Sequence, residues 1–260
     1  MAFSPFDLTG KVALITGGNS GIGLGMADGI AQAGAQVSIW GTNNAKNAAA
    51  VAQLQRHGTR ISAFQCDVSD AQAVSDAFAA TLEIHGRIDA CFANAGIGGR
   101  GAQFDQMPFE EWQRVIAVNL DGTYHTFKHA AGHMRQRAEA GNPGGRLVAT
   151  ASLAAISGQA RGEHYAATKG ALVSMIKALA VEYARHGVTA HTILPGWIET
   201  PMTQPSFAYG KFVDNVMKRI PARRWGQPGD FSAIAVYIMS DASAYHTADT
   251  FLIDGGYFAF

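Results

Sequence analysis

The chain has 260 residues, of which 48% are hydrophobic, enough for one large domain or two small ones with a sizeable core. Its 20 basic and 20 acidic side chains balance, so it lacks the charge that attracts nucleic acid or an anionic membrane. The first residues lack a secretory signal pattern, and no apolar stretch approaches the length of a membrane span. We therefore expect a cytoplasmic protein without nucleic-acid or membrane partners.

Short runs rich in β-forming residues alternate with longer helical patterns, which is typical of βαβ units and a parallel sheet. The sequence predicts one doubly wound, Rossmann-type α/β domain over residues 1–260, with about seven parallel strands and helices on both faces. The expected strands are 12–16, 36–40, 61–65, 88–92, 146–151, 188–194 and 250–253. A helix is expected at 22–33, and the two longest helices at 110–138 and 165–185.

A glycine-rich turn from Thr16 to Gly23 follows the first predicted strand and opens the first helix. Its spacing is G-x-x-x-G-x-G, which differs from the G-x-G-x-x-G of many dinucleotide sites. Glycines allow positive φ and let backbone N–H groups approach a pyrophosphate at the helix N-terminus. A glycine-rich turn alone is a weak signal, but the flanking strand and helix predict a dinucleotide site. The turn residues assigned to the cofactor are Gly17, Asn19, Ser20, Gly21, Ile22 and Gly23.

The ends of other predicted strands extend this site, because ligands of doubly wound sheets bind beyond the carboxyl ends of the strands. Each of these positions taken singly is also compatible with an ordinary turn. Together they predict cofactor contacts at Gly41, Thr42, Asn43, Asp67, Val68, Asn94, Ala95, Gly96, Pro195 and Gly196.

The residues after the second strand bear on the choice between NAD and NADP. An acidic residue there would bind the adenosine ribose, whereas a nearby arginine would accept a 2′-phosphate. Gly41 takes the acidic position and no arginine follows. Since Thr42, Asn43 and Lys46 could hydrogen-bond a phosphate, we expect NAD or NADP, with a slight preference for NADP.

Tyr165 and Lys169 lie four residues apart on a predicted helix, and therefore on one face. A neighbouring cation favours the phenolate, so the pair can act as a general acid and base at a carbonyl oxygen. Ser152, at the end of a predicted strand, could polarise the same oxygen. A tyrosine and a lysine at this spacing also occur by chance in surface helices. The pair therefore indicates an active site only in combination with the glycine turn.

In combination, the glycine turn, Asn94-Ala95-Gly96, Asn119, Ser152, Tyr165, Lys169 and Pro195-Gly196 resemble the short-chain dehydrogenase/reductase family. The resemblance extends from Val12 to Asp254-Gly255-Gly256, although Ala248 stands where relatives often carry glycine. It implies that Tyr165 exchanges the proton, Lys169 binds the nicotinamide ribose and lowers the tyrosine pKa, and Ser152 holds the substrate oxygen. It further implies that Asn119 supports a water-linked proton relay, and that Ile198 and Thr200 contact the nicotinamide carboxamide.

We therefore predict an oxidoreductase that moves a hydride between NAD(P)(H) and a ketone or secondary alcohol. The three residues between Tyr165 and Lys169 favour carbonyl chemistry over double-bond reduction, because the family's enoyl reductases have a wider gap. The alternative is a catalytically silent dinucleotide sensor of the same fold. A sensor need not keep Asn119, Ser152, Tyr165 and Lys169 together.

Residues 198–225 are expected to form a substrate lid rich in aromatic and methionine side chains. Such a lid suits a neutral apolar or cyclic substrate. Equally, these side chains could pack the lid onto the core. Further pocket positions are expected at Gly98, Leu153, Gln159 and His164.

Cysteine and histidine residues suggest no metal site. Cys66 and Cys91 should be too far apart for a disulfide, because two other strands separate theirs. His125, His129 and His133 share a helical face, but no carboxylate completes a metal site, so exposed or interface histidines are expected.

The resemblance implies that the two longest helices pair across subunits, giving a homotetramer or a dimer, with the aromatic tail 257–260 packed at an interface.

Overall fold

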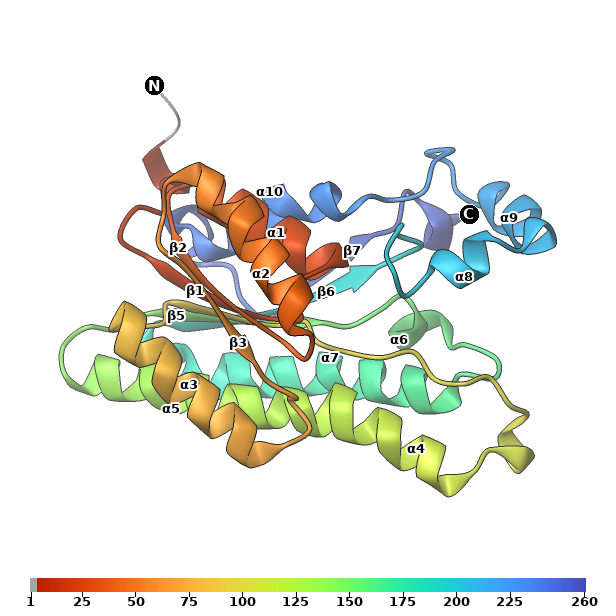
Figure 1. Cartoon of the computed structure of the whole chain (residues 1–260), viewed down its shortest axis with the longest axis horizontal. Helices are drawn as coiled ribbons and strands as arrows, with labels where there is room; N and C mark the ends of the chain where they lie inside the picture. Colours follow the sequence, from red (N-terminus) through yellow and green to blue (C-terminus); the bar gives the residue numbers. More distant parts are fainter. Residues whose placement is uncertain (1–3) are drawn as a thin grey trace.

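The computed structural model describes residues 4–260, so residues 1–3 of the predicted domain lie outside the described residues. Seven parallel strands form one sheet in the order β3-β2-β1-β4-β5-β6-β7, which confirms the predicted fold (Figure 1). The strands are β1 Val12–Thr16, β2 Gln36–Gly41, β3 Ile61–Gln65, β4 Ala90–Ala93, β5 Gly145–Thr150, β6 Val188–Pro195 and β7 Thr250–Ile253.

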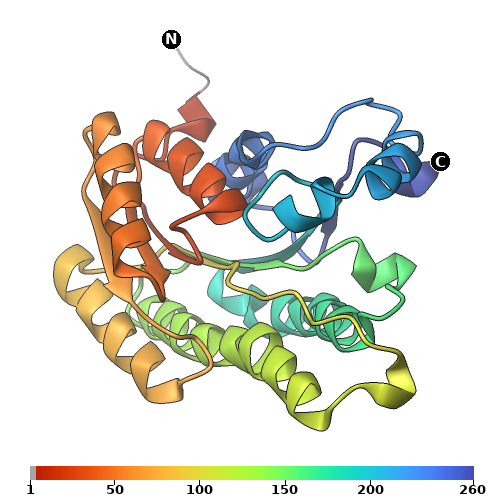
Figure 2. The same cartoon turned by 45° about the vertical axis from the view of Figure 1, so that its right-hand side comes forward.

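Helices cover both faces of the sheet, as predicted (Figures 1 and 2). Side chains of a strand alternate between the faces, so Leu14 packs in one core cluster while Ala13 and Ile15 pack in the other. Helices α1, α2 and α10 cover the face of Ala13, and α3, α5 and α7 cover the face of Leu14. The helices are α1 Gly21–Gln32, α2 Asn44–Leu54, α3 Ala71–His85, α4 Phe109–Ile116, α5 Gly122–Glu139, α6 Ala154–Ser157, α7 Glu163–Tyr183, α8 Gln204–Phe207, α9 Gly210–Met217 and α10 Ser232–Met239.

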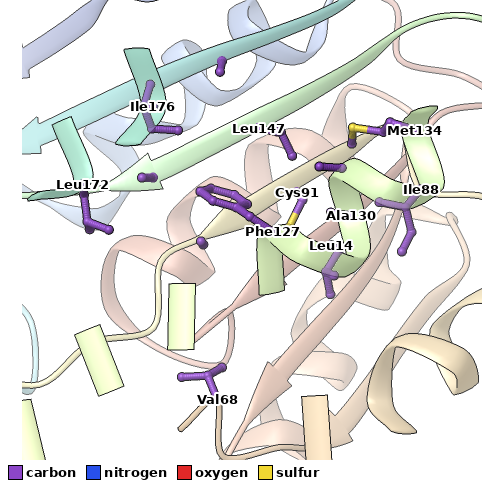
Figure 3. Packing of buried hydrophobic residues seen from close by; sticks show 14 of the residues in the cluster. Leu14, Val68, Ile88, Cys91, Phe127, Ala130, Met134, Leu147, Leu172 and Ile176 are labelled. Carbon is purple, nitrogen blue, oxygen red and sulfur yellow. The ribbon is translucent and has the colours of Figure 1, made fainter. Parts of the chain in front are cut away.

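Figure 3 shows how α5 meets the sheet: Phe127 points toward the strands that carry Cys91 and Leu147. All three side chains are buried, and burying one large apolar side chain stabilises a fold by about 1.5–3 kcal/mol. This packing holds α5 against the sheet. Leu172 and Ile176 of α7 belong to the same buried cluster, so the core also holds the helix that carries Tyr165 and Lys169.

The fourth strand begins two residues later than predicted, at Ala90 instead of Ile88. Ile88 is apolar and fully buried, which is why the sequence pattern includes it in the strand. Its backbone, however, is bonded to side chains: its N–H donates to Nε2 of His133, and its carbonyl accepts from Arg137. These groups are therefore not free to join the sheet ladder.

The long helix predicted at 110–138 is wrong as a single element, because a π-helical segment at Ala117–Asp121 separates α4 from α5. This wide turn contains Asn119, whose side chain is bonded to the backbone of Ile97 and to Thr168. Gly122 follows at once, and a Cβ there would lie 2.6 Å from the Val68 side chain. The hydrophobic pattern continues through the turn, so it gives no sign of the break.

The cysteines are free and buried, as predicted, and β2 and β1 lie between the strands β3 and β4. Burial, with Asp67 and Asp70 adding to it, raises the pKa of the Cys66 thiol to about 11. His129 and His133 are half-buried, with their rings against Phe78, instead of exposed. Within residues 4–260, no helix is both long and apolar enough to cross a membrane.

Candidate active site

A cavity of about 420 Å³ opens at the carboxyl edge of the sheet, within the size range of cofactor and ligand sites. Nearly all predicted site residues line it, from both halves of the chain. Those residues are Gly17, Asn19, Ser20, Gly21, Ile22, Gly41, Thr42, Asn43, Asp67, Val68, Asn94, Ala95, Gly96, Ser152, Tyr165, Lys169, Pro195, Gly196, Ile198 and Thr200. Of the predicted cofactor and catalytic residues, Gly23 and Asn119 do not line the cavity.

The glycine turn is built by close backbone contacts. Gly17 has a φ of +64°, and its N–H donates to the carbonyl of Trp40 at 2.7 Å. A Cβ on Gly23 would lie 2.3 Å from the carbonyl oxygen of Gly17, so this position excludes every side chain. The role of Gly23 is thus to let α1 approach the turn, although it does not line the cavity.

Thr16 and Asn94 tie the ends of β1 and β4 together beneath the cavity. The hydroxyl of Thr16 accepts hydrogen bonds from the backbone N–H groups of Asn94 and Ala95, both at 3.0 Å. Nδ2 of Asn94 donates in return to the carbonyl of Thr16 at 3.1 Å. The predicted Asn94-Ala95-Gly96 motif is thereby fixed against the glycine turn.

At the end of β2, an asparagine pair covers Gly41. Nδ2 of Asn19 donates to Oδ1 of Asn47 at 2.7 Å, and Nδ2 of Asn47 donates to the Gly41 carbonyl. A Cβ on Gly41 would lie 2.1 Å from Nδ2 of Asn19. The pair fills the space that a side chain at position 41 would need. The local packing therefore leaves no room for an acidic residue at this position.

The catalytic candidates converge at the other end of the cavity. Tyr165 and Lys169 lie one turn apart on α7, with Nζ of Lys169 5.5 Å from the Tyr165 ring centroid. Ser152 follows β5 and lines the cavity together with Tyr165 and Lys169. Nζ of Lys169 donates to the carbonyl of Thr150 at 2.8 Å. One helix face and one strand end thus bring the three candidates together.

Burial governs the ionisation of this group. It raises the pKa of Tyr165, and the hydrogen bond with Ser152 opposes that rise. Burial also lowers the pKa of Lys169 from 10.5 to about 8. The net direction for Tyr165 is opposite to the lowering expected from Lys169, because loss of water around the phenol outweighs the favourable interactions.

Asn119 does not line the cavity, but it is bonded to Ile97, which does. Its Oδ1 accepts from the Ile97 N–H at 2.8 Å, and its Nδ2 donates to the Ile97 carbonyl and to Thr168. Its side chain is fully buried, and both of its N–H groups donate in these bonds. Asn119 therefore links the segment after β4 to α7, directly beside Lys169.

Sequence reasoning missed several lining residues that stand next to predicted ones. A wider window around each motif would have found them, since they continue the same strand ends and turns. They are Trp40, Lys46 (expected only as a phosphate contact), Cys66, Ile97, Val118, Thr150 and Ala151, whereas Pro201, Met202 and Thr203 belong to the segment predicted as a lid.

The predicted pocket positions Gly98, Leu153, Gln159 and His164 do not line the cavity. His164 is fully buried beneath Gly99, where a Cβ would lie 1.9 Å from the imidazole Nε2. Its ring faces α4, with Nε2 3.6 Å from Oε1 of Glu111. The direction of the helix therefore turns His164 away from the cavity that its neighbour Tyr165 lines.

Most aromatic side chains of the predicted lid, together with Trp197 just before it, pack on one another. Phe207 stacks on Trp225 with ring centroids 4.3 Å apart, and Phe212 meets Trp197 edge-on at 4.8 Å. Of the large side chains in this segment, Ile198 and Met202 line the cavity. Of the two interpretations of the lid aromatics, packing describes these four rings.

Comparison with known proteins gives consistent matches over the whole chain. A family model described as enoyl-(acyl carrier protein) reductase matches residues 17–258. A 2-dehydro-3-deoxy-D-gluconate 5-dehydrogenase from Bacillus subtilis is 36% identical over 253 residues, covering 97% of this chain and 96% of the relative. A 3-oxoacyl-[acyl-carrier-protein] reductase, FabG, from Chlamydia pneumoniae is 35% identical, covering 96% of this chain and 97% of the relative.

Among solved structures, a gluconate 5-dehydrogenase from Burkholderia cenocepacia in complex with NADP and tartrate is 32% identical, with a TM-score of 0.92 and 100% of both chains covered. The named relatives act on alcohols and carbonyls, in agreement with the Tyr165–Lys169 spacing and despite the family model's description. Because they are dehydrogenases and reductases, the enzyme interpretation is favoured over a silent sensor.

Proposed function

The chain belongs to the short-chain dehydrogenase/reductase family of NAD(P)-dependent oxidoreductases, and on that premise we propose that it interconverts a neutral ketone and its secondary alcohol with NADP(H). The observation that carries the proposal is the convergence of Ser152, Tyr165 and Lys169 on the cavity that the glycine turn borders. The family assignment applies to the whole chain.

The cavity fits a dinucleotide for reasons visible in its backbone. Gly23 leaves no room for a Cβ against Gly17, so the turn stays open to a pyrophosphate at the start of α1. Gly17, Ser20, Gly21 and Ile22 would hold the pyrophosphate, and Asn94, Ala95 and Gly96 the nicotinamide ribose side. When bound, the nicotinamide supplies or accepts the hydride.

Tyr165 would exchange the proton at the substrate oxygen. Its raised pKa keeps the phenol protonated at neutral pH, which suits the donor role in ketone reduction. Ser152 would hydrogen-bond the same oxygen as charge develops on it. Lys169 would bind ribose hydroxyls and help Tyr165 release its proton in oxidation. Asn119 would hold the backbone of Ile97 and support a water that relays protons between Lys169 and solvent.

The preference for NADP rests on the end of β2. No carboxylate stands at Gly41 to repel a 2′-phosphate, and Lys46 and Thr42 line this end of the cavity. Asn43 caps α2 by accepting from the Lys46 N–H at 3.0 Å, so the helix N-terminus faces the same region. Positive charge, free donors and a helix N-terminus all favour a phosphate.

The proposal of a neutral substrate is based on the residues at the catalytic end of the cavity. The cavity wall includes the apolar side chains of Ile97, Ile198 and Met202, and the charged side chain next to Tyr165, that of Lys169, is bonded to the Thr150 carbonyl. Residues 198–225 would act as a lid, because Thr200 to Thr203 form part of the wall while both ends of the segment are tied together. An apolar wall under a lid excludes water from the reacting carbon.

We further propose a cytoplasmic homotetramer. The free, buried thiols of Cys66 and Cys91 suit a reducing compartment. Exposed apolar side chains such as Tyr124 on α5 and Val181 on α7 favour contact between these helices of neighbouring subunits. A monomeric mass in light scattering would contradict the assembly.

The test is reduction of a ketone panel with NADPH and with NADH, followed by absorbance. Tyr165→Phe should lose about 10²- to 10⁴-fold in turnover while still binding NADPH, because one proton transfer is removed. Faster turnover with NADH would refute the cofactor preference. Far better reduction of a ketone that carries a carboxylate, or oxidation of gluconate with NADP⁺ far faster than of neutral alcohols, would refute the substrate class.

A further inference from the structure

The base of the lid is joined to the C-terminal residues of the chain. The two ends of the lid meet where the Glu199 N–H donates to the Gly226 carbonyl and the Gly226 N–H donates to the Trp197 carbonyl. From this junction α8 and α9 extend outward, and both views place the C-terminus beside them (Figures 1 and 2). The two ends of the lid are thus bonded to each other, and the tail, residues 254–260, lies beside the lid.

A tight glycine turn brings the tail against the lid. Gly255 and Gly256 have φ values of +65° and +88°, and a Cβ on Gly255 would lie 3.0 Å from the Ile220 side chain. The Gly255 carbonyl accepts a hydrogen bond from the Ala222 N–H at 3.1 Å. The turn is held by Asp254, whose carboxylate accepts from the Gly256 and Phe258 N–H groups, both at 2.8 Å.

The same turn touches the cavity wall on its other side. A Cβ on Gly196, which lines the cavity, would lie 2.6 Å from Cβ of Asp254. The Gly196 N–H also donates to the Ile253 carbonyl. The end of β7 therefore contacts the cavity wall, and the glycine turn that follows it contacts residues 220 and 222 of the lid.

Tyr257 and Arg219 complete this junction. The guanidinium of Arg219 lies 4.2 Å above the Tyr257 ring centroid, and its Nη1 donates to the Tyr257 hydroxyl at 2.8 Å. Nearby, Arg223 holds a φ of +55°, an unfavourable conformation that persists only where the surroundings fix it. We propose that Tyr257 and Arg219 are positioning residues that hold the lid in its closed state over the bound dinucleotide.

This inference rests on the proposed lid, and it explains how a segment far from the catalytic residues affects cofactor affinity. Thr200 to Thr203 form the cavity wall on the lid side. Loosening the base at Arg219 would raise the population of open lid, from which the dinucleotide dissociates faster. Turnover limited by product release would then rise or stay constant, while the Kd for NADPH increases.

The experiment is an NADPH titration followed by tryptophan fluorescence, because Trp197 and Trp225 lie in the lid cluster. Tyr257→Leu and Arg219→Met should each weaken NADPH binding about three- to fivefold, the loss of one exposed cation–π contact and hydrogen bond. The double variant should lose no more than either single one. Tyr245→Leu, at a fully exposed tyrosine, is the matched control and should bind as wild type does.

Arg219→Lys should recover part of the affinity, and Tyr257→Phe, which keeps the ring, should lose less than Tyr257→Leu. Urea unfolding midpoints identify a variant that fails to fold, and then these milder variants carry the test. Wild-type affinity in both truncated variants, or additive losses in the double one, would overturn the inference. NADPH binding needs no ketone, so an inactive wild type would contradict the proposed function and leave this test intact.

Discussion

Lys169 should be a residue that costs stability in exchange for function. Its side chain is 4% exposed, and burial lowers its pKa from 10.5 to about 8. That gap corresponds to about 3 kcal/mol against holding the ammonium in the folded chain at pH 7. Lys169→Met removes the charge but leaves the Thr150 carbonyl without this donor, at a cost of about 1 kcal/mol. We expect the variant to be inactive and about 2 kcal/mol more stable at pH 7.

The pH dependence makes this reasoning specific. Between pH 8 and 10.5 the unfolded chain keeps the Lys169 proton while the folded chain has lost it, so wild-type stability rises with pH relative to the variant. The advantage of Lys169→Met is therefore full below pH 8 and disappears toward pH 10.5. Urea unfolding followed by tryptophan fluorescence measures it, with Lys177→Met, at an exposed position of α7, as control. A less stable Lys169→Met variant at pH 7, or a difference that does not change with pH, would refute the argument.

Three further predictions concern other positions. Gly41→Asp should weaken NADPH binding about tenfold or more, because the new carboxylate overlaps Asn19 and repels a 2′-phosphate; an unchanged Kd in a fluorescence titration would contradict this. Ala248→Gly should raise the unfolding free energy by about 0.5–1 kcal/mol, since Ala248 has a φ of +63°. Thermal unfolding tests that change, and a lower melting temperature would mean that packing of the methyl group matters more. Cys91 is fully buried, and burial raises its pKa, so it should react with a thiol reagent only after unfolding; rapid labelling of the native protein would argue against the described core.

Much of the fold follows from the sequence because strand periodicity and strand ends carry strong signals. The bounds of β1, β3 and β7 match the prediction, and the residues after β1, β2, β4 and β6 line one cavity. The predicted start of β4 was wrong because the buried side chain of Ile88 gives no information about its backbone groups. Those groups are bonded to side chains of α5 and not to a neighbouring strand. Such long-range bonds leave no local pattern.

The lid shows a different limit. An aromatic side chain serves equally well against a substrate or against another ring, so the sequence alone leaves both interpretations open. The stacking of Phe207 on Trp225 decides for packing at those two positions. The raised pKa of Tyr165 was likewise beyond sequence reasoning, since it depends on how deeply α7 and the cavity wall bury the phenol.

The π turn at Ala117–Asp121 has a consequence for changes of chain length. A π turn holds about one residue more than an α turn, so losing one residue there would tighten it into an α turn. Asn119 and Gly122 would shift along the helix, and Asn119 would lose its bonds to Ile97. A one-residue deletion in this turn should therefore be as damaging as removing a core side chain, whereas the exposed turn at 141–143 should tolerate one. Length variation among viable variants of this chain is accordingly expected to avoid the turn.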